Sequence, residues 1–216
     1  MIRCVCFDMD GVLFDTENLG GAVMGEAARA QGCTLTEPQW RSLIGTTMAV
    51  TAERLQAWCP ALDVPLFLED WQRLMLEHVR RSGMPKKDGA DEVLRGLREG
   101  GMRLALCSSN VPAIIHEYLE IAGWSDVFET VVTLDQVTAA KPKPDMYLYA
   151  AARLGAAPAE CAGVEDSFSG IRSVRDAGMT SVMIPDVIPY DPVTMQPYVD
   201  HLLGSLRELP ACLAQA

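Results

Sequence analysis

The sequence predicts an α/β protein, in which a doubly wound parallel sheet carries an inserted block of helices. Three features of the 216-residue chain support this prediction. The chain opens on a short apolar run, Ile2 to Phe7, and further apolar runs alternate with helical patterns from Gly89 onward. The stretch between Thr16 and Arg81 has a helical pattern throughout. Strands that alternate with helices form parallel sheets with right-handed crossovers, because each helix packs on the sheet as the chain returns.

The elements of the sheet-forming part follow in a regular order. Their bounds come from where an apolar period begins and where glycine, proline or polar residues interrupt it. After the strand at Ile2–Phe7, we expect a helix at Ala90–Glu99, a strand at Leu104–Cys107, a helix at Ala113–Ala122, an extended segment at Val127–Thr133, a helix at Met146–Leu154, a strand at Cys161–Val164, a helix at Gly170–Ala177, the last strand at Met179–Ile184 and a closing helix over 205–213. Ligands of open α/β sheets bind where such strands end.

The inserted block is predicted to contain four helices. Their expected positions are Ala22–Gln31, Glu37–Leu43, Ala49–Trp58 and Leu66–Arg80, followed by a return linker over 85–89. The sequence therefore predicts two domains, with residues 1–15 and 83–216 in the α/β core and residues 16–82 in a helical domain. The alternative is that these helices complete a single domain.

Composition excludes several classes of protein. With 49% hydrophobic residues, the chain can bury a substantial core. No run of about 18 apolar residues is present, which argues against a membrane span. The run from Ile2 to Phe7 is too short for a signal peptide. The net charge of −11 argues against a nucleic-acid partner, because binding phosphates along a duplex requires clustered positive charge.

The cysteines predict free thiols rather than a disulfide framework or a zinc site. Their number is odd and no CxxC spacing occurs. Free thiols fit a reducing compartment, so we expect a cytoplasmic protein. Cys107 adjoins a polar segment, but we interpret it as a small buried hydrophobic residue. The seven cysteines are Cys4, Cys6, Cys33, Cys59, Cys107, Cys161 and Cys212.

Two carboxylates directly follow the first strand. Asp8 and Asp10 are spaced i and i+2, and Gly11 follows them. A carboxylate at a strand end can attack phosphorus while its neighbour transfers protons and a divalent cation screens their charges. The alternative is an Asp/Gly turn that closes the strand. A calcium loop of the EF-hand kind is disfavoured, because its acidic spacing and closing glutamate are missing.

Polar side chains also end the second strand. Ser108, Ser109 and Asn110 follow the strand at Leu104–Cys107 and precede a predicted helix. Neutral donors near a helix N-terminus favour a phosphoryl anion without adding a titratable group. The alternative is that these residues cap the helix.

Two later segments add charged residues. Lys141 lies in a Lys-Pro-Lys-Pro stretch whose rigid backbone can hold an ammonium between a carboxylate and a phosphoryl oxygen. The alternative is a solvated turn, which is what we expect for Lys143. Glu165 and Asp166 follow the strand at Cys161–Val164 and can bind a hard cation such as Mg²⁺, which takes one or two carboxylates. The alternative is that Asp166 or Ser167 caps the following helix.

Together these segments resemble the four motifs of the haloacid dehalogenase superfamily. The matches are Asp8 to Thr16 with motif I (DxDGxLxD), Ser108 with motif II, Lys141 with motif III, and Glu165 with Asp166 for motif IV. The motifs occur in order, and the resemblance covers nearly the whole chain. It implies a Rossmann-like core and a helical cap of the C1 type that acts as a mobile lid and excludes water. Most members of the superfamily are Mg²⁺-dependent phosphatases.

The resemblance also implies a role for each motif residue. Asp8 attacks phosphorus and forms an aspartyl-phosphate, while Asp10 protonates the leaving alkoxide and then activates water. Lys141 and Mg²⁺ offset negative charge, and Ser108 orients the transferred group. The implied phosphate-binding residues are Ser108, Ser109, Asn110 and Lys141. The implied Mg²⁺ ligands are Asp8, the main-chain carbonyl of Asp10, Asp166 and Glu165.

Two other functions remain open from the sequence. The subfamily of β-phosphoglucomutase is the most similar one, which makes a sugar-phosphate mutase the alternative. In those enzymes a cap histidine and a basic residue act at the positions that correspond to Gly20 and Met48 of this chain, so hydrolysis is the default expectation. Dehalogenation is disfavoured, because the position of Asp10 carries another residue in that subgroup. The less favoured alternative is a non-catalytic binding protein, against which the presence of Asp8 and Asp10 argues.

The expected partner is a small phosphorylated metabolite. A hexose phosphate, a polyol phosphate and phosphoglycolate all fit the motifs. The cap segment Gly45, Thr46 and Thr47 either lines the substrate pocket or forms a loop at a helix start. Members with this type of cap lead us to expect a monomer or a weak dimer.

Overall fold

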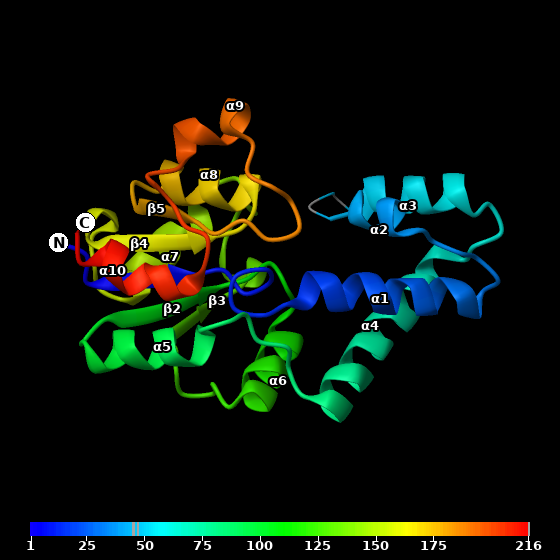
Figure 1. Cartoon of the computed structure of the whole chain (residues 1–216), viewed down its shortest axis with the longest axis horizontal. Helices are drawn as coiled ribbons and strands as arrows, with labels where there is room; N and C mark the ends of the chain where they lie inside the picture. The colour runs from blue at the N-terminus through cyan, green and yellow to red at the C-terminus, as the bar shows by residue number, and fades with distance from the viewer. Residues whose placement is uncertain (45, 47, 216) are drawn as a thin grey trace. The chain divides into compact units, whose positions relative to one another are not determined.

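The computed structural model describes residues 1–44, 46 and 48–215. The chain divides into two compact units, one formed by Met1–Asp15 with Lys86–Ala216 and the other by Thr16–Pro85. The first unit contains the sheet, and the second contains helices α1 to α4 (Figure 1). Within the described residues, no helix is both long enough and apolar enough to cross a lipid bilayer.

The α/β unit is built on a parallel six-stranded sheet in the order β3-β2-β1-β4-β5-β6. The strands are β1 Cys4–Phe7, β2 Arg103–Cys107, β3 Thr130–Val132, β4 Cys161–Glu165, β5 Thr180–Met183 and β6 His201–Leu202. In the register of the sheet, Cys6 of β1 lies opposite Ala105 of β2 and Gly163 of β4. The strand order reverses beside β1, which is the switch point where open α/β sheets bind ligands. The predicted doubly wound fold is confirmed.

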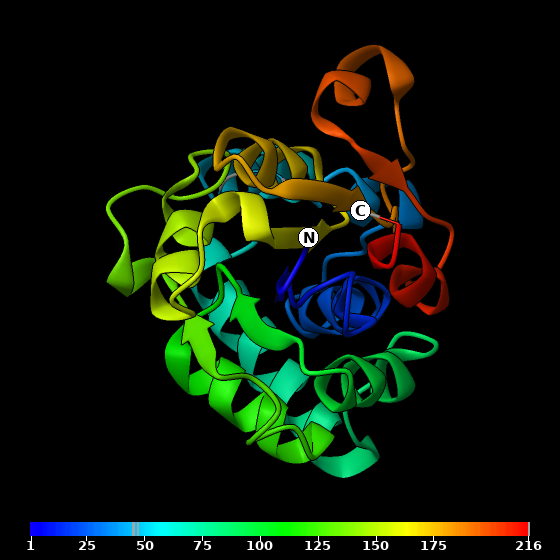
Figure 2. The same cartoon turned by 90° about the vertical axis from the view of Figure 1, so that its left-hand side faces the viewer.

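Helices cover both faces of this sheet (Figure 2). The helices of this unit are α5 Ala90–Glu99, α6 Pro112–Ala122, α7 Asp145–Arg153, α8 Phe168–Asp176, α9 Pro192–Met195 and α10 Leu209–Leu213, and α9 packs on α8. Successive strand residues point to opposite faces, so Cys4 and Cys6 of β1 share one cluster with Tyr147 and Leu154 from the α7 region. All of β1 is buried, which explains why its sequence is continuously apolar rather than alternating.

The end of the chain differs from the sequence prediction. Met179–Ile184 is not the last strand, because β6 follows and pairs with β5 through Val182 opposite His201. A two-residue strand carries no readable period, and its partner alone defines it. The predicted closing helix is shorter, since a 3₁₀ turn at Leu206–Glu208 precedes α10.

The helical unit consists of α1 Thr16–Ala30, α2 Glu37–Arg41, α3 Met48–Trp58 and α4 Val64–Ser82. Helix α1 begins six residues before the predicted start, and its first half contains Gly20 and Gly21. Glycine disfavours a helix, but packing requires a glycine at position 21, because a Cβ there would collide with the ring of Trp40. At the neighbouring position, Trp71 Nε1 donates to the Gly20 carbonyl at 3.0 Å.

The prediction that all cysteines are free is wrong for one pair. Cys33 and Cys59 form a disulfide with a Cα–Cα distance of 6.1 Å. Both belong to the hydrophobic cluster of the helical unit, which packs around Leu55 and Phe67 and draws the ends of α1 and α3 together. Because the two cysteines are 26 residues apart and follow different helices, their spacing carried no signal. The other five cysteines are free, as predicted.

Candidate active site

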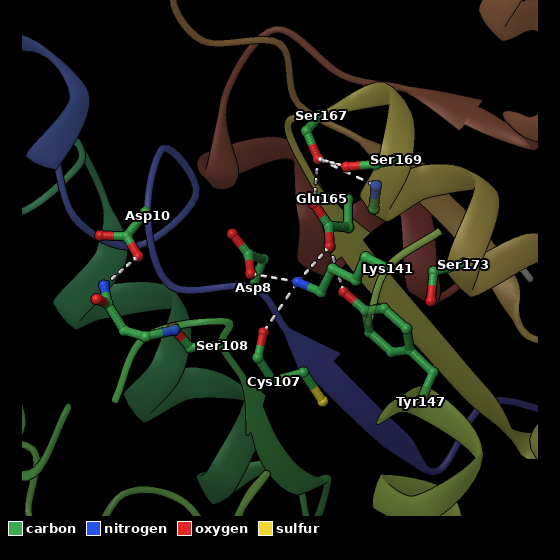
Figure 3. Close-up of polar contacts among 12 residues, drawn as sticks. Asp8, Asp10, Cys107, Ser108, Lys141, Tyr147, Glu165, Ser167, Ser169 and Ser173 are labelled. Carbon is green, nitrogen blue, oxygen red and sulfur yellow. Dashed lines mark hydrogen bonds and ion pairs between the residues drawn. The ribbon is translucent and has the colours of Figure 1, made fainter. Parts of the chain in front are cut away.

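Three adjacent strand ends assemble the candidate active site. Asp8 directly follows β1, Ser108 follows β2, and Glu165 ends β4. Because β1 pairs with both β2 and β4, these ends meet at one edge of the sheet. The backbone continues the ladder into the site, since Asp8 N–H donates to the Val164 carbonyl at 3.0 Å. Sequence segments more than 50 residues apart thereby supply neighbouring side chains (Figure 3).

A buried lysine joins two of these strand ends. Lys141 Nζ lies 2.5 Å from Asp8 Oδ1 and 2.7 Å from Glu165 Oε1, and it also donates to the Cys107 carbonyl at 3.1 Å. Its side chain is 8% exposed. The ammonium therefore has three oxygen partners from three strands, and its position is restricted (Figure 3). The predicted alternative of a solvated turn does not apply to Lys141, whereas Lys143 is exposed.

Glu165 is held from several directions. Tyr147 Oη donates to its Oε1 at 2.6 Å, and Ser167 Oγ donates to its Oε2 at 3.2 Å. Any Cβ at position 170 would collide with the Glu165 carboxylate, so Gly170 is needed for the start of α8 to approach this closely. Both carboxylate oxygens of Glu165 thus have partners within the protein. This arrangement supports Glu165 as the group that holds Lys141.

Burial and charge set the protonation of the cluster. Burial raises the pKa of Asp8 to about 8, the Lys141 ammonium opposes this rise, and the charges of Glu165 and Asp10 add to it. Burial alone would lower the pKa of Lys141, but the adjacent Asp8 and Glu165 raise it above its ordinary value. Burial, together with Glu165, also raises the pKa of Tyr147, so its hydroxyl stays a neutral donor. An additional positive charge near Asp8 would favour its ionised form.

The Asp10 side of the site is more open. Asn110 Nδ2 donates to Asp10 Oδ2 at 3.0 Å, and both residues are half-buried. Ser108 is buried, and its Oγ accepts from the Asn110 N–H at 3.2 Å, while Ser109 is exposed. Helix α6 does not use these residues as a cap, because its N-cap is Val111, which makes no side-chain cap hydrogen bond. The helix-capping alternative for this segment is therefore wrong.

A possible cation site lies beside Asp8. Asp8, Glu165 and Asp166 each offer an oxygen, and these oxygens lie within 4.8 Å of one another. Gly11 allows the close approach, since a Cβ there would collide with the Asp166 carboxylate. An all-oxygen donor set of this kind fits a hard divalent cation such as Mg²⁺. Ser167 caps α8, since its side chain accepts a hydrogen bond from the Gly170 N–H, so the capping alternative is confirmed for Ser167 and wrong for Asp166.

The predicted substrate-binding segment of the helical unit is only partly described. Gly45 and Thr47 lie outside the described residues. Thr46 Oγ1 donates to the Leu43 carbonyl at 2.7 Å and lies 2.9 Å from Thr51 Oγ1. Its contacts are those of a loop that leads into α3, and a substrate role for Thr46 stays a prediction.

Two residues near the site were missed by sequence reasoning. The sequence places Tyr147 only within the expected helix Met146–Leu154, because no local pattern shows that its hydroxyl reaches Glu165. Asp186 follows β5 as the motif acids follow β1 and β4, and this strand-end position was a usable signal. Its Oδ1 lies 2.6 Å from Lys87 Nζ.

The fold places this cluster at the switch point of a parallel α/β sheet, where proteins of this class bind ligands. The chain matches the family model for haloacid dehalogenase-like hydrolases over residues 5–184. It is 31% identical to a putative phosphatase, YhcW, from Bacillus subtilis over 216 residues, which covers 99% of this chain and 96% of the relative. It is also 31% identical to a phosphorylated carbohydrates phosphatase from Thermotoga maritima over 184 residues, 84% of each chain.

A solved structure shows the same fold over the full length. A putative β-phosphoglucomutase from Thermotoga maritima superposes with a TM-score of 0.85 at 24% sequence identity and covers 100% of both chains. The chain therefore belongs to the haloacid dehalogenase-like hydrolase family. It is an enzyme of that family, and proteins named phosphatases are among its relatives.

Proposed function

We propose that the protein is a Mg²⁺-dependent phosphatase that hydrolyses a small phosphomonoester through an aspartyl-phosphate. One observation carries the proposal. Asp8 is a buried strand-end carboxylate with Lys141 Nζ at 2.5 Å, and the more open Asp10 follows two residues later. A fixed nucleophile beside a fixed cation, with a second carboxylate in reach of solvent, is what covalent phosphoryl transfer requires.

Each residue of the cluster has a task in this reaction. An oxygen of Asp8 attacks phosphorus as the bond to the leaving oxygen breaks, and Asp10 donates its proton to that oxygen. Asp10 then takes a proton from a water molecule that attacks the aspartyl-phosphate, which releases inorganic phosphate and restores Asp8. Lys141 balances the charge on the equatorial phosphoryl oxygens, and Glu165 holds Lys141 in place. Ser108 and the exposed edge of its loop bind the phosphoryl group.

The proposed cation site uses Asp8, the Asp10 carbonyl and Asp166, with Glu165 at its border. A bound Mg²⁺ supplies charge neutralisation between the nucleophile and the phosphoryl oxygens. The close approach that Gly11 allows and the all-oxygen donor set support this assignment. We expect Mg²⁺ to support turnover and Ca²⁺ to inhibit it. Ca²⁺ prefers a larger, looser shell and would let both oxygens of Asp8 bind, which blocks attack.

The proposed substrate is a sugar phosphate, a polyol phosphate or a similar small metabolite. The name of the relative from Thermotoga maritima, a phosphorylated carbohydrates phosphatase, supports this class. We also propose that residues 16–82 form a cap that closes over the site during the reaction and excludes water. For the protein as a whole, we propose a monomer or weak dimer in the cytoplasm, a location supported by the five cysteines that stay free outside the Cys33–Cys59 disulfide.

A mutase is the second candidate, because a structure named as a putative β-phosphoglucomutase shares the fold over the whole chain. Gly20 and Met48 at the predicted cap positions favour hydrolysis instead. A mutase must keep the aspartyl-phosphate from water until a sugar hydroxyl accepts the group, and neither glycine nor methionine can prepare that hydroxyl.

The test measures both activities on one sample. Inorganic phosphate release is followed across a panel of phosphorylated metabolites with Mg²⁺, with Ca²⁺ and with a chelator. Formation of glucose 6-phosphate from β-glucose 1-phosphate is followed in parallel, with a trace of glucose 1,6-bisphosphate as primer. Hydrolysis that exceeds isomerisation by a wide margin supports the phosphatase. Isomerisation with little phosphate release contradicts it, and so does full turnover with Ca²⁺.

A further inference from the structure

One buried carboxylate oxygen of the α/β unit has no hydrogen-bond partner among the described residues. It is Oδ2 of Asp186, whose side chain is 9% exposed. Its other oxygen, Oδ1, lies 2.6 Å from Lys87 Nζ. A buried acceptor without a donor costs roughly 1–3 kcal/mol, and more when it is charged. Most such groups in native proteins have a partner, so this oxygen is expected to meet a donor that is not part of the chain.

Asp186 emerges at the same edge of the sheet as Asp166. The ladder between β4 and β5 extends to Ile184, whose N–H donates to the Glu165 carbonyl at 2.8 Å. Asp166 and Asp186 therefore follow two neighbouring parallel strands. Both carboxylates also face Gly11, since a Cβ on this glycine would collide with Asp166 Oδ2 and lie 3.3 Å from Asp186 Oδ2. The unpaired oxygen thus faces the acidic cluster.

Lys87 holds Asp186 by its other oxygen. The Lys87 N–H donates to the Leu13 carbonyl at 2.9 Å, which ties the lysine backbone to the loop after β1. Its Nζ also lies 3.8 Å from Asp15 Oδ1. This ion pair orients the Asp186 carboxylate and neutralises part of its charge. It does not explain why Oδ2 is buried, because a single oxygen satisfies the contact with Lys87.

We propose that Asp186 is a positioning residue of the cation site, and that its Oδ2 accepts a hydrogen bond from a water molecule on the cation. The inference rests on the proposed function, from which it takes the cation. Mg²⁺ that is bound by one or two carboxylates keeps several waters. Those waters are strong donors, and Asp186 Oδ2 is a buried acceptor on the side of Asp166 and Gly11. Hydrogen-bond partners beyond the direct ligands typically change metal affinity by about 10- to 100-fold.

The test measures cation binding without substrate. Free Mn²⁺ is counted by electron paramagnetic resonance while the full-length protein is titrated, for the wild type, Asp186→Asn, Asp166→Asn and Asp176→Asn. The last variant is the matched control, because it removes the same charge from a surface pair with Arg172 at 3.5 Å. In Asp186→Asn, Lys87 holds the amide oxygen, so the NH₂ group replaces the acceptor and preserves the shape of the side chain.

We expect Asp186→Asn to raise the Kd for Mn²⁺ by about 10- to 100-fold. Asp166→Asn should raise it further, and Asp176→Asn should leave it unchanged. Thermal unfolding gives a second measurement. Without metal, Asp186→Asn should be at least as stable as the wild type, because the substitution removes the buried carboxylate oxygen that has no donor and leaves the oxygen that contacts Lys87. The rise in Tm that Mg²⁺ produces should be smaller in Asp186→Asn than in the wild type.

Two results would overturn the inference. One is an unchanged Mn²⁺ affinity in Asp186→Asn together with a loss of stability that is equal with and without Mg²⁺, which would make Asp186 only a partner of Lys87. The other is a wild type that does not bind Mn²⁺. The proposed function fails separately: weaker Mn²⁺ binding by Asp186→Asn, with no phosphate release by the wild type, would support the cation site and contradict the phosphatase.

Discussion

The two sides of the candidate active site differ in burial and in the way their charges are held. On one side, Lys141 Nζ lies between the buried carboxyl groups of Asp8 and Glu165, at distances of 2.5 and 2.7 Å. On the other side, half-buried Asp10 accepts a hydrogen bond from Asn110, which is also half-buried. Asp8 on the buried side and Asp10 on the more open side are 2 residues apart in the sequence, so one sheet edge carries both environments.

This difference matches the two tasks of the proposed reaction. A nucleophile and its counter-charge gain from burial, because charges interact more strongly when water is excluded and the groups need not reorganise. An acid/base group must exchange protons with water and with the leaving group, so its side chain must be accessible to solvent and substrate. We therefore expect substitutions on the buried side to change both chemistry and stability, and substitutions on the open side to change chemistry alone.

The largest effect is expected for Asp8→Asn. The amide cannot attack phosphorus, so phosphate release should fall by roughly 10⁴-fold or more, while circular dichroism shows an intact fold. The wild type trapped during turnover should carry a phosphoryl group on Asp8, detectable by mass spectrometry. Near wild-type turnover in this variant would show that no covalent step occurs.

Asp10→Asn should have the next largest effect. Loss of both proton transfers should cost on the order of 10² to 10⁴ in rate. Because Asp10 is on the open side, the thermal unfolding midpoint of the Asp10→Asn variant should stay close to that of the wild type. Leaving groups with a low pKa need no proton. The rate of enzyme phosphorylation should therefore fall less with p-nitrophenyl phosphate than with an alkyl phosphate. An equal loss for both substrates would contradict the role of Asp10 as an acid.

Tyr147→Phe tests the buried side more gently. It removes the hydroxyl that donates to Glu165 at 2.6 Å and keeps the ring under Lys141, whose Nζ is 5.4 Å from the ring centroid. A hydrogen bond to a charged group is worth about 1.5 to 3 kcal/mol, so kcat should fall roughly tenfold while KM changes little. Tyr149→Phe on the same helix is the matched control and should change neither kcat nor KM. Equal effects of the two variants would mean that the contact with Glu165 does not position Lys141.

The last comparison concerns the stability of the fold and its dependence on pH. In the metal-free protein, burial raises the pKa of Asp8 from 3.8 to about 8. Between these values the folded state alone holds the proton, so this contribution to stability is full below 3.8 and is lost as the pH rises towards 8. The wild type should therefore lose up to about 1.4 kcal/mol per pH unit relative to Asp8→Asn in this window. Denaturant unfolding at pH 5, 6, 7 and 8 measures the difference.

Mg²⁺ provides the control for that measurement. A bound cation favours the ionised carboxylate, so saturating Mg²⁺ should flatten the pH dependence of the wild type. The pH dependence of stability of the Asp8→Asn variant should change little on addition of Mg²⁺. A difference between the two proteins that is constant with pH would mean that Asp8 is ionised in the folded protein throughout this range.

The sequence by itself determined the fold class and which side chains lie together in the candidate site. Apolar runs and helical periods are local signals, each contained within about ten residues, and Ala90–Glu99 forms helix α5 with the predicted bounds. The motif acids could be placed because parallel strands end at one edge of the sheet, so Asp8, Ser108 and Glu165 had to lie near one another.

Only the tertiary structure decided how these groups satisfy one another. Lys141 and Asp8 are 133 residues apart, and Lys87 and Asp186 are 99 apart, so no local pattern encodes either pair. The disulfide of Cys33 and the short strand β6 likewise depend on distant partners. Hydrogen bonds and ion pairs act over a few ångströms in space rather than along the chain. Folding therefore determines which buried oxygen has a donor, and among the residues that the structure describes it gives none to Oδ2 of Asp186 beside Asp166 and Gly11.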